Sequence, residues 1–443
     1  MSKKVALHNL GCKVNAYEVE AMQQLLEKAG YEIVPFEEGA DIYLINTCTV
    51  TNIADRKSRQ MLHKAKKMNP DAIVVATGCY VQTDTQKLEA DSAVDLILGN
   101  NQKKQIVEAL EEYEKEHAKK VKVIEINKTK EYEDLSIGYT AEHVRAYIKV
   151  QDGCNQFCTY CIIPYARGRV RSRKIAEVLE EVRTLAARGY KEVVLTGIHL
   201  SSYGLDFPKE ERESLLSLIQ AVHEVDGIAR IRLGSLEPRI ITEEFMEGIS
   251  ALPKVCPHFH LSLQSGCDRT LKNMNRRYSA PEYAEKCELI RRFYSAPALT
   301  TDVIVGFPME TEEDFEDSYE FVKNIHFYET HIFKYSRRQG TKAAAMDGQL
   351  TEAVKAQRSE KMLKLHEIRA KEYETAMIGR TLELLLEEEV EIGGKTYFMA
   401  HSKEYVRAVI EKTDAHKVND LVKAKAVDFA DEHVLLAICE DLY

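Results

Sequence analysis

Residues 153–161 read GCNQFCTYC, and this stretch spaces Cys154, Cys158 and Cys161 as C-x3-C-x2-C. It directly follows the apolar run RAYIKV at 145–150, which predicts a strand. Three thiolates at this spacing can hold one soft metal centre, either zinc or an iron-sulfur cluster. A closed zinc site needs a fourth ligand, and His143 would lie on the far side of the predicted strand. The stretch therefore favours a metal centre with one open coordination position.

Five further strand-like runs follow, each succeeded sooner or later by an amphipathic stretch: EVVLTG, ARIRLG, HFHLSL, TTDVIVG and THIFKYS. Six strand-helix units predict a partial (β/α)6 barrel over 143–375, closed by a long charged helix that starts near residue 352. The loops after the strands build the active site in folds of this kind. The GCNQFCTYC stretch is the first of these loops.

The N-terminal region, residues 1–130, alternates short apolar runs with amphipathic stretches. This pattern predicts a parallel sheet with helices on its faces. Cys12, Cys48 and Cys79 stand at the ends of three predicted strands, in HNLGC, INTCTV and ATGCY. Because the carboxyl ends of parallel strands share one edge of a sheet, we expect these three cysteines to meet. The charged stretch 127–140 then predicts a linker.

From residue 376 short β-like runs predict a small all-β domain, 376–443, so the expected fold class is α/β with a β tail. No apolar run reaches the roughly 20 residues of a membrane span, and MSKKVAL lacks a secretory signal, which favours a cytoplasmic protein without a membrane partner. Ten cysteines in a reducing compartment favour metal binding over disulfides. The net charge of −10 argues against nucleic-acid binding through overall charge.

The loop and its continuation, CTYCIIPYARGRVRSR at 158–173, resemble the radical S-adenosylmethionine enzymes and in particular their methylthiotransferase branch. The resemblance covers nearly the whole chain, including a tail that resembles a small RNA-binding (TRAM or OB-like) barrel. It implies that the barrel cysteines (Cys154, Cys158 and Cys161) hold a 4Fe4S cluster whose open iron binds S-adenosylmethionine. It also implies that the N-terminal cysteines (Cys12, Cys48 and Cys79) hold an auxiliary 4Fe4S cluster.

The resemblance further implies a tRNA-modifying transferase that adds a methylthio group to carbon 2 of a modified adenine. That carbon has an unactivated C–H bond, so a cofactor must carry the difficult step. Cleavage of S-adenosylmethionine would give the radical that removes the hydrogen, and the auxiliary cluster would hold the delivered sulfur. The implied partners are tRNA, a reductant protein of the flavodoxin or ferredoxin type, and a sulfur donor.

The residues around the N-terminal cysteines indicate the substrate. LGCKVNAYEVE and NTCTVTNIADRKSRQ resemble the branch that modifies N6-threonylcarbamoyladenosine next to the anticodon. The isopentenyladenosine branch usually shows GCQMN, and the branch acting on a ribosomal protein aspartate usually shows GCPKN. Both of those substrates remain alternatives. A zinc-stabilised RNA-binding protein without catalysis and an electron carrier are the alternatives from other classes.

Several segments at the ends of barrel strands fit cofactor binding. By resemblance, Gly197 lies near the methionine amino group, and Ser235, Glu237 and Gln264 are polar candidates for cofactor or substrate. Asp302 lines the barrel mouth. The competing interpretations are a tight turn for Gly197 and a salt bridge or helix cap for Glu237 and Asp302.

The motif ARGRVRSRK at 166–174 places arginines at alternate positions: Arg167, Arg169, Arg171 and Arg173. If this stretch is extended, all four point to one side and could bind tRNA phosphates; otherwise it is a solvated basic loop. Arg276 and Arg277 could extend the patch, with Tyr278 stacking on a base. The tail carries eight Lys and Arg against fourteen Asp and Glu, so its contact with tRNA is an open question.

Overall fold

The computed structural model describes residues 2–140 and 144–439, and His143, weighed above as a ligand, lies outside the described residues. Within residues 2–140 the apolar runs form a parallel sheet in the order β2-β1-β3-β4-β5-β6. Its strands are β1 (Lys4–Asn9), β2 (Glu32–Val34), β3 (Ile42–Thr47), β4 (Ile73–Gly78), β5 (Leu96–Leu98) and β6 (Lys120–Lys122). The parallel N-terminal sheet predicted from the alternating pattern is thus confirmed.

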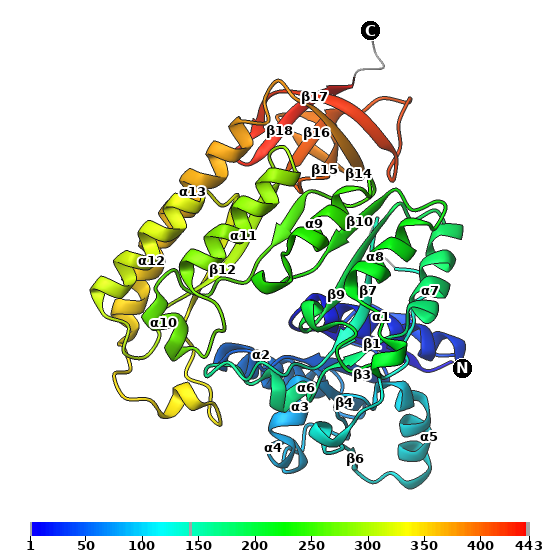
Figure 1. The fold of residues 1–443 in the computed structure, drawn as a ribbon. Coiled ribbons are helices and arrows are strands. Elements are labelled where there is room, and N and C mark those ends of the chain that lie inside the picture. The colour runs from blue at the N-terminus through cyan, green and yellow to red at the C-terminus, as the bar shows by residue number, and fades with distance from the viewer. Residues whose placement is uncertain (1, 141–143, 440–443) are drawn as a thin grey trace.

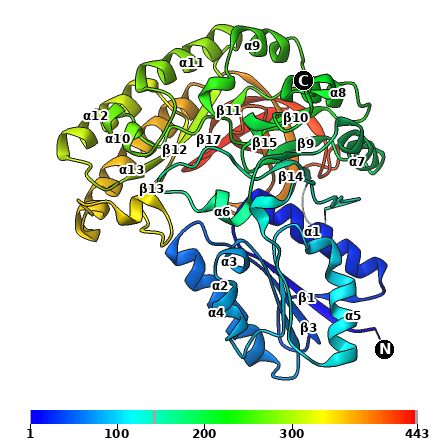
Figure 2. The same cartoon turned by 60° about the horizontal axis from the view of Figure 1, so that its bottom comes forward.

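Helices cover both faces of this sheet (Figure 2). They are α1 (Lys13–Lys28), α2 (Asn52–Met68), α3 (Cys79–Thr83), α4 (Thr85–Glu89), α5 (Ile106–Glu116) and the 3-10 turns η1 (Lys103–Gln105) and η2 (Ile126–Lys128). Successive residues of β3 alternate between the faces: Ile42 and Leu44 pack with α1 and α5, and Tyr43 and Ile45 pack with α2, α3 and α4. A strand buried on both sides reads as a continuous apolar run, as β3 does.

The central region forms a partial barrel, as the strand-helix units predicted (Figure 1). Its strands are β7 (Arg145–Asp152), β8 (Arg171–Ser172), β9 (Glu192–Gly197), β10 (Arg230–Leu233), β11 (His258–His260), β12 (Ala298–Val305) and β13 (Glu329–Lys334). The hydrogen-bonded orders are β10-β9-β7-β8 and β11-β12-β13. Parallel bridges from Ile231 to Val255 and from Leu236 to Leu261 join the two groups. Strand β8 alone runs antiparallel to its neighbour among these described strands.

Most barrel helices pack outside these strands and enclose the main apolar core. The helices of this region are α6 (Ile163–Arg167), α7 (Ile175–Ala187), α8 (Leu215–His223), α9 (Glu243–Ser250), α10 (Asp268–Asn273), α11 (Ala280–Phe293), α12 (Glu312–Ile325), α13 (Glu352–Thr375) and the 3-10 turns η3 (Leu200–Ser202), η4 (Lys209–Glu211), η5 (Pro238–Ile240) and η6 (Lys342–Ala345). The short α6 packs instead against α3 and η2 of the N-terminal unit. Helix α1 of the N-terminal unit also contacts β7 and β9, so it lies between the sheet and the barrel (Figure 1).

The stretch 127–140 packs between the two units rather than forming a free linker. The Tyr17 hydroxyl donates to the Leu135 carbonyl at 2.6 Å, and the Ile137 amide donates to Glu181 Oε1 at 2.8 Å. Leu135 and Ile137 are buried in the main core. Most residues of this stretch are polar or charged, so its composition did not reveal the few apolar residues that anchor it in the core.

The tail forms a closed β-barrel in the order β14-β15-β16-β18-β17 and packs against α13 (Figure 1). Its strands are β14 (Thr381–Ile392), β15 (Lys395–Ser402), β16 (Arg407–Glu411), β17 (Leu421–Asp431) and β18 (Val434–Cys439). The predicted β tail is confirmed, and with it the α/β class. None of the described helices is both long enough and apolar enough to cross a membrane.

Candidate functional site

The N-terminal cysteines follow three neighbouring strands of the parallel sheet. Cys12 immediately precedes α1, Cys48 follows β3, and Cys79 opens α3 directly after β4. A Cβ atom on Gly11 would lie 3.1 Å from Cys48 Sγ, so the backbone beside Cys12 approaches that thiol closely. Gly78, at φ 97°, has no room for a Cβ because the Thr47 carbonyl would lie 2.5 Å away. The fold therefore brings the three thiols to one edge of the sheet.

Cys79 accepts one hydrogen bond from the barrel and one from its own N-terminal unit. Arg167 Nε, at the end of α6, donates to Cys79 Sγ at 3.1 Å, and Asn100 Nδ2 donates at 3.7 Å. The same guanidinium pairs with the Glu18 carboxylate of α1. Such donors stabilise a thiolate more than a thiol, because a charge-assisted hydrogen bond favours the anion.

Cationic side chains are in excess next to this thiol. Fully or nearly buried here are Lys103, Lys149, Arg167 and Arg171 with the carboxylates Glu18 and Asp152. Lys149 Nζ lies 2.8 Å from Glu18 and 2.7 Å from Asp152. Glu133 is a third buried carboxyl group, and its burial raises its pKa. Even when Glu133 is counted, the described cations outnumber the carboxylates. Unbalanced buried charge is costly, and three thiolates of an anionic cluster would offset it. The residues present thus fit an iron-sulfur cluster on the N-terminal cysteines.

The barrel cysteines lie in the loop between β7 and α6. Gly153 makes this loop possible: at φ 70°, a Cβ there would lie 1.9 Å from the Arg169 carbonyl oxygen. Burial raises the pKa of Cys154 to about 11 and that of Cys161 to about 12. Arg276 Nη1 donates to Cys158 Sγ at 3.2 Å. Since thiols must lose their protons to bind iron, cluster binding at this loop would release protons, and Arg276 would stabilise one resulting thiolate.

Neither cysteine trio is arranged for a single zinc ion. Tetrahedral Zn–S bonds of about 2.3 Å place the sulfurs roughly 4 Å apart. Among the described residues, the metal-ligating atoms that all lie within 4.8 Å of one another are those of His260, Asp302 and His331. Neither trio brings all three thiols within that distance, which disfavours the zinc alternative.

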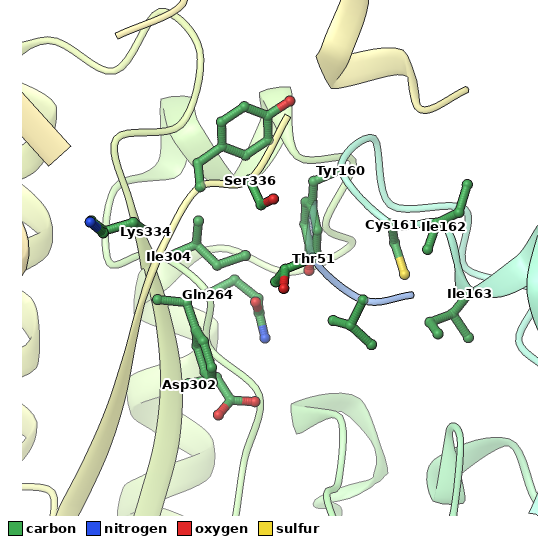
Figure 3. Close-up of a pocket in the computed structure, with 13 residues that line it drawn as sticks. Thr51, Tyr160, Cys161, Ile162, Ile163, Gln264, Asp302, Ile304, Lys334 and Ser336 are labelled. Atoms are coloured by element: carbon green, nitrogen blue, oxygen red, sulfur yellow. The ribbon is translucent and has the colours of Figure 1, made fainter. Parts of the chain in front are cut away.

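Two neighbouring cavities open beside the two trios. The smaller, of about 210 Å³, has Cys161 on one side and Gln264 and Asp302 on the other (Figure 3). The larger, of about 580 Å³, has Cys12 in its wall. Asp302 and Phe333 line both cavities. A molecule bound at these two residues would therefore reach toward one cysteine of each trio.

The predicted cofactor residues fall around these cavities with one exception. Gly197 and Ser235 line the larger cavity, and Gln264 lines the smaller. Gln264 has a left-handed backbone, at φ 73°, and its amide donates to the Asp302 carbonyl at 2.8 Å. Glu237 is not among the described lining residues of either cavity, and it accepts a hydrogen bond from Arg239 at 2.8 Å.

The prediction of an arginine face was wrong. Arg167, Arg171 and Arg173 are buried, and Arg173 pairs with Glu181. The stretch is not extended throughout, because α6 includes Arg167 and Gly168 turns the chain at φ 71°. Arg169 alone of the four is exposed, over the ring of Phe157.

The second basic group also differs from the expectation. Arg277 is exposed, but Arg276 contacts Cys158 as described above. Tyr278 is buried, and its hydroxyl donates to the Ser262 carbonyl at 2.6 Å. The proposed stacking of Tyr278 on a base was therefore wrong. In the tail, Lys403 Nζ donates to the Pro253 carbonyl of the barrel at 3.1 Å, so this lysine contributes to the domain contact.

Sequence reasoning missed the basic residues of the larger cavity: Lys13, His258, His260 and His331. His258 and His260 are two residues apart on β11, and residues so spaced share one face of a strand. That period-two signal could have revealed them. Lys13 is next to Cys12, but a lysine at the start of a helix carries no signal of its own.

Family models match two segments of the chain. Residues 4–99 match the uncharacterized protein family UPF0004, and residues 148–322 match the radical SAM superfamily. The threonylcarbamoyladenosine tRNA methylthiotransferase MtaB of Bacillus subtilis (strain 168) is 41% identical, over 95% of this chain and 93% of that protein. The protein of the same name from Aquifex aeolicus (strain VF5) is 44% identical, over 87% and 93%.

A second kind of relative is also similar. The tRNA-2-methylthio-N(6)-dimethylallyladenosine synthase of Moorella thermoacetica is 38% identical over 85% of both chains. Among solved structures, the radical S-adenosylmethionine methyltransferase TsrM from Kitasatospora setae aligns with a TM-score of 0.57 at 16% identity, over 75% of this chain and 73% of that chain, which shows a shared fold. On the extent and identity of these alignments, the chain belongs to the radical S-adenosylmethionine family of tRNA methylthiotransferases.

Proposed function

We propose that this protein adds a methylthio group to carbon 2 of N6-threonylcarbamoyladenosine next to the anticodon of tRNA. The proposal is supported by relatives named for that reaction at 41% and 44% identity over most of both chains. The observation that carries it is the pair of cavities, which share Asp302 and Phe333 and have Cys161 and Cys12 in their walls. A base at their junction would be within reach of both cysteine trios.

The cofactors are two 4Fe4S clusters and S-adenosylmethionine, and when bound they supply the radical and sulfur chemistry that opens an unactivated C–H bond. We assign the auxiliary cluster to the N-terminal cysteines and the other to the barrel cysteines. The chain's own residues position these groups. Arg167 and Arg276 donate to one sulfur of each trio. Apolar side chains such as Ile162, Ile163 and Ile304 line the smaller cavity and would exclude water from it.

The remaining assignments are part of the same proposal. Gly197, Ser235, Gln264 and Asp302 are our candidates for cofactor contacts, because they line the cavities. We propose domain limits of 1–130, 143–375 and 376–443, a cytoplasmic location, a flavodoxin- or ferredoxin-type reductant and a separate sulfur donor. For tRNA contact we retain the exposed Arg169 and Arg277.

The alternative substrate is isopentenyladenosine, because the Moorella relative is named for a reaction on N(6)-dimethylallyladenosine in tRNA. Mass spectrometry of tRNA nucleosides distinguishes the two, comparing a strain that lacks this gene with the same strain after the gene is restored. We expect the methylthio form of threonylcarbamoyladenosine to disappear and return. Loss of the methylthio form of isopentenyladenosine instead would change the substrate, and loss of neither would direct attention to a ribosomal protein aspartate.

A further inference from the structure

One lysine and three histidines line the larger cavity. Lys13 comes from the start of α1, His258 and His260 from β11, and His331 from β13. Two acidic residues, Asp302 and Glu329, line the same cavity. The cavity therefore offers a cation together with several hydrogen-bonding groups.

Lys13 is the cation in this wall that has no close ion-pair partner among the described residues, although Glu192 and Glu329 act on its charge from farther away. Among the described residues it forms no ion pair or hydrogen bond, and its ammonium lies 5.9 Å from the centre of the Tyr147 ring. Neighbouring cations are paired: Arg145 lies 2.6 Å from Glu387, and Arg232 lies 2.9 Å from Glu192. Lys13 is therefore available to a ligand.

The histidine wall is held in place by its own contacts. The rings of His260 and His331 stack with their centres 5.6 Å apart. His260 Nδ1 lies 3.0 Å from Thr300 Oγ1, and its Nε2 lies 3.3 Å from Asp302 Oδ2. Asp302 is thus engaged by a histidine, whereas the imidazole of His331 is exposed toward the cavity with no hydrogen bond among the described residues.

We propose that Lys13, with His331 beside it, binds the carboxylate of the threonylcarbamoyl substituent and so selects this substrate. The inference rests on the proposed function and adds the residues that recognise the substituent. That substituent carries a carboxylate, a hydroxyl and N–H groups, which match a cation, imidazoles and the acceptor Glu329. A dimethylallyl substituent has none of these groups and would leave the polar wall unpaired. Sites that lose such hydrogen bonds discriminate strongly against the substrate lacking them.

The direct test compares three anticodon stem-loop RNAs with the reconstituted, anaerobic wild-type enzyme. They carry threonylcarbamoyladenosine, its methyl ester, or N6-dimethylallyladenosine, and kcat/KM for methylthiolation is measured on each. The ester keeps the size of the substituent and removes its charge. We expect the acid to exceed the ester by roughly ten- to a hundredfold, as for the loss of a charge-assisted hydrogen bond.

Variants then identify the residues responsible. In Lys13→Gln the acid should fall to the level of the ester while the ester keeps its wild-type value, and Lys13→Arg should retain most of the preference. His331→Gln should reduce the preference partially. Lys28→Gln, at the far end of the same helix, is the matched control and should leave the acid-to-ester ratio unchanged. Because Lys13 adjoins Cys12, iron content is measured for each variant.

The outcomes separate the inference from the proposed function. If the wild type uses acid and ester equally well, or if Lys13→Gln keeps the wild-type ratio, the inference is overturned and the proposed function stands. If the wild type modifies the dimethylallyl RNA and not the threonylcarbamoyl RNA, the proposed function fails first. If Lys13→Gln loses iron, the wild-type comparison of acid and ester decides the question together with His331→Gln.

Discussion

Replacing Arg167 by glutamine should lower the reduction potential of a cluster on the N-terminal cysteines. The Arg167 guanidinium donates to Cys79 Sγ at 3.1 Å and is fully buried, so solvent and salt screen its charge little. Reduction adds negative charge to the cluster, and a nearby cation stabilises the reduced form more than the oxidised form. Removing that cation therefore makes reduction less favourable.

The energy of the hydrogen bond between Arg167 and Cys79 limits the size of the change in reduction potential. A hydrogen bond to a charged group contributes about 1.5–3 kcal/mol. If all of it acted on the reduced state, a one-electron potential would fall by roughly 60–130 mV. Because part of the bond also stabilises the oxidised state, this range is an upper limit, and we expect a decrease of several tens of mV.

The assay is a redox titration followed by EPR, in protein whose barrel cysteines are replaced by alanine so that one cluster remains. Arg171→Gln is the matched control: Arg171 is equally buried and lies 3.6 Å from Asp152, but it bonds carbonyl oxygens and no sulfur. Arg167→Lys keeps the charge if the glutamine variant folds poorly. Equal potentials for Arg167→Gln and Arg171→Gln would refute a specific role of the contact with Cys79.

Three further results follow from buried groups. Cys79→Ala should halve the iron content and abolish methylthiolation, whereas retained activity would contradict the auxiliary-cluster assignment. Glu18→Gln should destabilise the contact between sheet and barrel by about 3–5 kcal/mol, because buried cations lose their carboxylate partner. Limited proteolysis at the chain segment after α1 measures this effect. Unchanged protection from cleavage would contradict it. Burial alone would raise the pKa of Glu192, but Arg232 and its neighbours lower it to about 2. Above pH 4.5 the free energy of unfolding of the wild type should exceed that of Glu192→Gln by about 3 kcal/mol. This difference should disappear as the pH falls toward 2, and urea unfolding at each pH measures it.

Periodicity predicted the architecture because the inner strands β1, β3, β4 and β5 are buried on one or both faces. The pattern failed at the chain between α5 and β6. The amphipathic stretch KKQIVEALEEYEKEHAKK at 103–120 predicts one helix. In the structure His117 adopts a left-handed backbone at φ 49°, so α5 ends at Glu116 and Lys120 begins β6. Local periodicity carries no information about such a single-residue turn.

The site was less predictable than the fold. Strand-end positions predicted that Cys12, Cys48 and Cys79 would share one edge, because sheet topology alone decides it. The roles of the arginines could not be predicted in this way. Whether Arg167 faces solvent or a thiol depends on the contact between two units distant in sequence, since its partners Glu18 and Cys79 lie 149 and 88 residues away.

The charge balance at this contact indicates why the barrel and the sheet are assembled around the N-terminal cysteines. Buried ion pairs rarely stabilise a protein more than well-packed apolar residues of similar volume would. Here the buried cations near Cys79 also outnumber the buried carboxylates, so the arrangement is unfavourable unless an anion is present. The sheet supplies the thiols, and the barrel supplies Arg167 and Lys149. Neither unit alone contains both halves of the site, and an anionic cluster placed between them would therefore stabilise the same contact that completes its environment.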